Sequence, residues 1–159
     1  MSKINFKIIL LQFIGCIFLI QGIQNIYFTT QIEKYYCYIE YFTNPKCECF
    51  KKLNLNGMSG EFISNIFLWF FYGFLIGIIL IIIINWKKNR HPLNSIITFA
   101  ILFVLFPIRF FRNEYVNLIF LLIGKLLTPD FRVQNIIGGV IYTLIGSIIL
   151  WKSYTIKNV

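Results

Sequence analysis

Two asparagines, Asn117 and Asn135, stand 18 positions apart in the C-terminal third of the chain. Asn117 lies within the apolar residues 115–119, and Asn135 ends residues 131–135, which open the last apolar segment. An asparagine side chain donates and accepts hydrogen bonds but exchanges no proton near neutral pH. This pair can therefore bind a peptide backbone or a polar ligand. Two aspartates at the same positions could instead share a proton and activate water.

Charged residues flank the two asparagines. The acids Glu114 and Asp130 offer a substitute pair for proton transfer. Neighbouring basic residues would keep both carboxylates ionised, however, and a proton-sharing pair cannot tolerate that state. Arg112 and Arg132 could bind a lipid phosphate or a partner's carboxylate, and they could equally anchor helices at the depth of the lipid head groups.

Four apolar segments must position these residues. The 159 residues are 58% hydrophobic with a mean hydropathy of +0.73, which is more apolar surface than a soluble domain of this length can bury. The segments long enough to consider as spans are residues 8–26, 66–86, 96–111 and 136–151. We therefore predict an all-α membrane protein with four transmembrane helices, forming a single integral membrane domain over residues 1–159.

The charges are distributed unevenly along the chain, whose formal net charge is +9. All six acids fall in the outer segments 27–64 and 112–134. The termini and the connection between the second and third spans carry only bases, namely Lys3, Lys7, Lys87, Lys88, Arg90, His91, Lys152 and Lys157. This positive-inside pattern predicts a multi-pass protein of a bacterial inner membrane with both termini in the cytoplasm. It also argues against a nucleic acid partner.

The first outer segment, residues 27–64, is rich in tyrosine, phenylalanine and threonine. The aromatic residues 35–42 predict a strand, so we expect a small β element on the membrane surface. On the oxidising side of the membrane, a disulfide from Cys37 to either Cys47 or Cys49 would close a loop of moderate size. We expect a structural disulfide rather than a redox or metal site, and we predict neither a metal nor a cofactor.

Length, span count, the long outer segment after the first span and the two asparagines together resemble the lipoprotein signal peptidase family (signal peptidase II). In that family a V-D-(F/M)-I stretch and an F-N-x-A-D stretch each supply one catalytic aspartate. Asn117 and Asn135 occupy the corresponding positions, with the separation of the family's pair, and Phe131 keeps the aromatic residue of the second stretch.

Other family motifs are only partly kept. The D-Q-x-x-K-like pattern at the end of the first span corresponds here to Gln21 and Asn25, where an acid and a lysine would stand. Of the G-N-x-x-D-R signature, only Arg112 remains, and the N-x-G-A-A-F loop has a loose counterpart beginning at Asn56.

The resemblance implies a signal-peptidase scaffold without its chemistry, a pseudoenzyme. We expect it to bind a lipoprotein, a membrane lipid or a transmembrane helix of another membrane protein, as a subunit of a membrane complex. Asn117, Asn135, Arg112 and Arg132 are the expected binding residues. Two alternatives remain open. One is a divergent but active aspartic prolipoprotein peptidase, and the other is an unrelated small structural subunit of a membrane complex.

Overall fold

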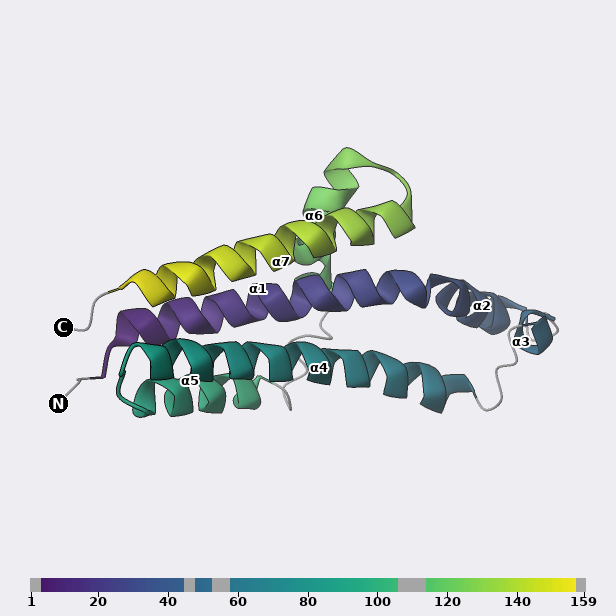
Figure 1. Ribbon diagram of the computed structural model, residues 1–159. Coiled ribbons are helices and arrows are strands. Elements are labelled where there is room, and N and C mark those ends of the chain that lie inside the picture. The colour runs from purple at the N-terminus through teal and green to yellow at the C-terminus, as the bar shows by residue number, and fades with distance from the viewer. Residues whose placement is uncertain (1–3, 45–47, 53–57, 106–113, 157–159) are drawn as a thin grey trace.

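The structure, a computed structural model, describes residues 4–44, 48–52, 58–105 and 114–156. These residues form helices and contain no strand (Figure 1). The helices are α1 (Phe6–Thr30), α2 (Ile32–Thr43), α3 (Cys49–Lys52), α4 (Met58–Lys87), α5 (Leu93–Val104), α6 (Glu114–Leu127) and α7 (Phe131–Thr155). The all-α part of the predicted fold class is therefore confirmed for the described residues.

In the described part of the chain, two helices, α1 and α7, are long and apolar enough to cross a membrane. Each has 25 residues, and their mean hydropathies are 2.1 and 1.8. At about 1.5 Å per residue each exceeds the roughly 30 Å of a hydrocarbon core. This indicates a membrane protein, although a buried core helix or a signal sequence has the same properties. The predicted spans 66–86 and 96–111 begin within α4 and α5, and residues 106–111 lie outside the described residues.

The α1 and α7 backbones pack directly against each other along an antiparallel seam (Figure 1). Gly15 and Gly22 of α1 face Gly146 and Gly139 of α7. A Cβ atom added to Gly22 would lie 2.8 Å from the Gly139 carbonyl oxygen, and one added to Gly146 would lie 2.8 Å from that of Gly15. Because seven residues are about two helical turns, the glycines repeat on one face of each helix. We call these four residues the glycine seam.

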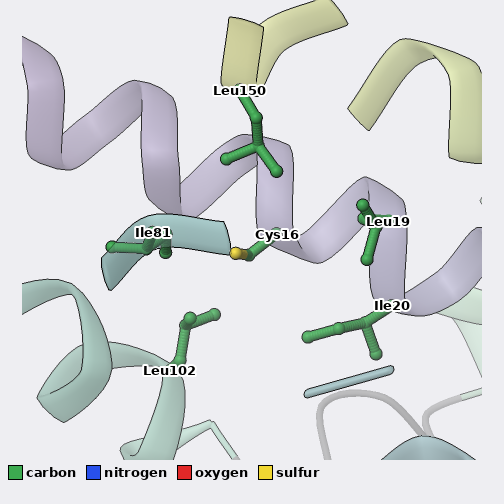
Figure 2. Packing of buried hydrophobic residues seen from close by; sticks show 6 residues of the cluster. All are labelled: Cys16, Leu19, Ile20, Ile81, Leu102 and Leu150. Carbon is green, nitrogen blue, oxygen red and sulfur yellow. The ribbon is translucent and has the colours of Figure 1, made fainter. Parts of the chain in front are cut away.

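On another face of α1, α4 and α5 complete a core of buried apolar side chains. Its residues come from four helices and are Cys16, Leu19, Ile20, Ile81, Leu102 and Leu150 (Figure 2). A Cβ atom on Gly77 of α4 would approach the Cys16 Sγ to 2.9 Å, whereas one on Gly73 would meet Ile20 at 3.4 Å. Toward its α2 end, α4 diverges further from α1 (Figure 1).

The predicted β element is wrong, because residues 35–42 lie in the helix α2. Phe28, Ile32 and Tyr35 recur at helical spacing across the break between α1 and α2. The Tyr35 ring packs 5.2 Å from that of Phe28 and 6.1 Å from that of Phe131 in α7, measured between ring centroids. The preference of aromatic residues for strands depends on what they pack against, and here their partners lie along a helix.

The glycine seam predicts that the same substitution, glycine to alanine, changes the free energy of unfolding very differently at two positions. Gly22→Ala places a methyl group against the α7 backbone, so we expect the free energy of unfolding to fall by about 1–3 kcal/mol. Gly73→Ala meets only ordinary contacts and gains helix propensity of about 1 kcal/mol, so it should be neutral or stabilising. Thermal unfolding of both purified variants in detergent tests this. Equal melting temperatures would contradict the seam.

Candidate functional site

The two asparagines that the sequence pairs lie on neighbouring helices, Asn117 in α6 and Asn135 in α7. α6 runs antiparallel to α7, and Gly124 packs against the backbone of Gln134, so a Cβ atom on Gly124 would lie 2.7 Å from the Gln134 Cα. Asn135 therefore lies next to this contact. Asn117 is seven residues before Gly124, which is about two turns or 10 Å along α6.

Asn135 is engaged within its own helix. Its side chain is 3% exposed, and its Nδ2 donates to the Phe131 carbonyl oxygen at 2.8 Å, one turn earlier. The side chains of Asn117 and Glu114 and the whole of Arg112 lie outside the described residues.

Asp130 and Arg132 organise the start of α7. The Asp130 Oδ1 accepts from the backbone N–H groups of Arg132 at 2.8 Å and Val133 at 3.2 Å, so this aspartate is the helix N-cap. The Arg132 guanidinium pairs with Glu33 of α2 at 3.2 Å, in an exposed position. Exposed ion pairs of this kind contribute little stability. Asp130 thus has a structural role as the N-cap of α7.

A polar and aromatic cluster lies where α1, α6 and α7 meet. Asn25 donates its Nδ2 to the Phe120 carbonyl oxygen at 3.3 Å, and the Tyr142 hydroxyl donates to that of Ile119 at 3.0 Å. The ring of Phe18 packs 5.4 Å from that of Phe120, measured between centroids. These contacts anchor α6 on one side of α1.

Gln21 belongs to the same stretch of α1, and in the described part of the chain both polar atoms of its side-chain amide are buried without a hydrogen-bond partner. Its side chain is 0% exposed, and neither its Nε2 nor its Oε1 has a hydrogen-bond partner among the described residues. A buried amide without a partner costs about 1–3 kcal/mol. Gln21 and Asn25 are also the positions that the resemblance matches to the family's pattern at the end of the first span. From the sequence alone, both residues were recognisable only as departures from that pattern.

A second polar cluster, which sequence reasoning missed, joins α1, α4 and α5 at the other end of the bundle. The Gln12 Nε2 donates to the Asn85 Oδ1 at 2.7 Å, and the Asn85 Nδ2 donates to the Ser95 Oγ at 2.7 Å. The signal available in the sequence was a pair of amides, Gln12 and Asn85, each inside a long apolar run. Their amides pair with each other across two helices.

Arg90 completes this cluster, and the end of α4 positions it. Asn89 has a φ of 46°, and the N–H groups of Asn89 and Arg90 bond back to the carbonyls of Trp86 and Asn85 at 3.0 Å each, as in a Schellman motif. The buried Arg90 guanidinium then donates to the carbonyl of Ser153 at 2.6 Å, at the end of α7. Desolvation by burial lowers the pKa of Arg90, and the negative end of the α7 dipole offsets that cost.

Cys37 and Cys49 form a disulfide that ties α2 to α3. This is one of the two pairings that the sequence left open, and Cys47 lies outside the described residues. Within the described part of the chain, no group of three or more His, Cys, Asp or Glu side chains is arranged to hold a metal ion.

No protein-family model, no curated protein and no solved structure matches this chain. The likeness to signal peptidase II therefore rests on the residues and the layout described above.

The Arg90 contacts predict a specific loss of stability. Arg90→Gln removes the donors at the C-terminal end of α7, and we expect the free energy of unfolding to fall by about 1–3 kcal/mol. Lys87→Gln is the matched control, because Lys87 is exposed and its substitution removes the same charge from the same connection. Thermal unfolding in detergent compares the two. A drop of equal size in both variants would assign the effect to charge rather than to the contacts of Arg90.

Proposed function

We propose that this chain is a catalytically inactive, signal-peptidase-II-like protein of a bacterial inner membrane. It crosses the membrane four times, and its binding site lies where α1, α6 and α7 meet. The bound group is a backbone segment of a lipoprotein or of another membrane protein. The observation that carries this proposal is the buried amide of Gln21, which has no partner among the described residues.

A buried unpaired amide is well suited to recognising a helix that has unwound. Such a backbone offers both N–H and C=O groups, and one glutamine amide can donate to the first and accept from the second. In hydrocarbon an unpaired backbone group costs several kcal/mol, so binding relieves a penalty on both partners. Asn25, one turn along α1, contributes its own amide to the same region, although its Nδ2 already bonds to α6.

The proposed topology is supported by the position of several basic residues and the chain ends, which lie at the same end of the bundle. The start of α1, the connection from α4 to α5 and the end of α7 lie at one end of the bundle (Figure 1). The Asn5 N–H donates to the Asn94 Oδ1 at 3.0 Å, and Arg90 bonds to Ser153. The basic residues Lys7, Lys87, Lys88 and Lys152 belong to this end, and the positive-inside rule assigns it to the cytoplasm.

The lack of peptidase chemistry is supported by the hydrogen bonds that nearby side chains already make within α7. The Asn135 amide bonds to its own helix, and the Asp130 Oδ1 accepts backbone N–H groups as the cap of α7. The alternative of an active peptidase would need Asp130 to leave the cap and join Glu114. The alternative of a packing subunit assigns no role to the unpaired Gln21 amide.

Gln21→Leu separates binding from structure. Removing an unpaired buried amide should raise the free energy of unfolding by about 1 kcal/mol or more, while binding of a lipidated prolipoprotein weakens about tenfold. The matched control is Gln12→Leu, which removes a glutamine of the same helix that is also 0% exposed but bonded to Asn85. We expect the control to lower stability and leave binding unchanged. Equal affinities of the Gln21 variant and the unaltered protein, measured by fluorescence anisotropy, would overturn the binding site.

The double reversion Asn117→Asp with Asn135→Asp tests the ancestry and the loss of chemistry. We expect the unaltered chain to leave a lipidated prolipoprotein intact and the revertant to cleave it, because a carboxyl pair restores general acid–base catalysis worth about 10²–10⁴-fold. The readout is the size of the substrate on a gel. Cleavage by the unaltered chain that Glu114→Gln abolishes would establish the enzyme instead. An intact substrate with both proteins would remove the signal-peptidase part of the proposal.

A further inference from the structure

A cavity of about 320 Å³ lies along the half of α1 nearest to α2. Its described lining is almost entirely apolar and comes from Ile23, Ile26, Tyr27 and Thr30. These residues follow one another at helical spacing and so occupy a single face of α1. The cavity opens to the surroundings, because Ile26 is 39% exposed and Thr30 is also exposed.

This cavity is separate from the polar and aromatic cluster where α1, α6 and α7 meet. Phe18, which packs on α6, is nine residues before Tyr27, and nine residues rotate the helix by about 900°, which is half a turn beyond two full turns. The cavity and α6 are therefore on opposite sides of α1. On the cavity side, Ile26 packs against Gly139 of α7, since a Cβ atom on Gly139 would lie 2.6 Å from the Ile26 Cγ1.

The α4 backbone diverges from α1 beside the half of α1 that lines the cavity (Figure 1). α4 contacts α1 closely at Gly77 and less closely at Gly73, and it then moves away from α1 toward the end where α2 begins (Figure 1). In the other half of α1, the same face carries Cys16 and Leu19, which the core covers (Figure 2). The packing that closes the core on one half of α1 is thus replaced by open volume on the other half.

The size and polarity of the cavity select its occupant. A transmembrane helix is about 10–12 Å across and spans about 30 Å, so it is far too large. The volume suits a small or slender molecule, at the lower end of the roughly 300–1,000 Å³ of typical ligand pockets. Apolar cavities stay free of water and take up hydrocarbon, which restores the dispersion contacts of the lining.

We propose that this cavity binds one acyl chain of a phospholipid from the surrounding membrane. The inference rests on the membrane placement in the proposed function, but it does not depend on the Gln21 site or on the ancestry. The acyl chain lies along α1 from Thr30 toward Ile23, a distance of about 10 Å. The head group remains at the Thr30 end, where the polar residues Gln31 and Glu33 follow.

Native mass spectrometry of the full chain, purified in mild detergent after incubation with phosphatidylglycerol, measures the retained lipid. Ile23→Trp and Thr30→Trp fill the cavity, and each should lower the retained lipid about tenfold. Leu10→Trp is the matched control on α1, because Leu10 is 56% exposed and lies outside the cavity lining. We expect the control to retain one lipid per chain, as the unaltered protein does.

Thermal unfolding shows whether a variant loses lipid only because it no longer folds. Thr30→Trp should unfold at the temperature of the unaltered protein because Thr30 is exposed. Equal retention by the cavity variants and the control would overturn the proposal, as would an unaltered chain that retains no lipid. Membrane fractionation separates this failure from that of the proposed function. A chain found outside the membrane fraction refutes the membrane placement itself, whereas a membrane-bound chain without retained lipid refutes only the acyl-chain site.

Discussion

The close approach of α1 and α7 at the glycine seam is the contact on which the other helices depend. Helices in lipid gain little from the hydrophobic effect, so they associate through close packing and hydrogen bonds. Gly15 and Gly22 against Gly146 and Gly139 let the two backbones touch along both halves of the bundle. The paired helices then offer one surface to α4 and α5 and another to α6, which explains why most contacts between helices involve α1 or α7.

The two ends of this bundle differ in how their polar groups are satisfied. At the end with the chain termini, Gln12, Asn85 and Arg90 bond to one another and to the end of α7. At the opposite end, Gln21 is buried without a described partner. Since a buried polar network specifies a fold only when its members are paired, the first end is suited to stability and the second to recognition.

The sequence predicted the helical class and the two spans that lie within α1 and α7, because a long apolar run can be read from the sequence without knowing what packs against it. It could not predict α2, since Tyr35 packs on Phe28 across a helix break and Tyr36 packs on Phe131, which is distant in sequence. Gly15 and Gly22 carried no signal by themselves, because a close approach requires knowing which helix lies opposite. The burial of Arg90 could not be predicted either, because its partner is the carbonyl of Ser153 at the end of α7.

The placement of two features on opposite sides of α1 argues for two different ligands. Gln21 offers hydrogen bonds in the half of the bundle where α6 packs, whereas the apolar cavity at Ile23 and Tyr27 lies half a turn away. A single lipid-modified peptide would have to wrap around α1, through the glycine seam or past α4, to reach both. A membrane lipid in the cavity avoids this difficulty. It fills the cavity along α1 and thereby supports the helix that carries the recognition group.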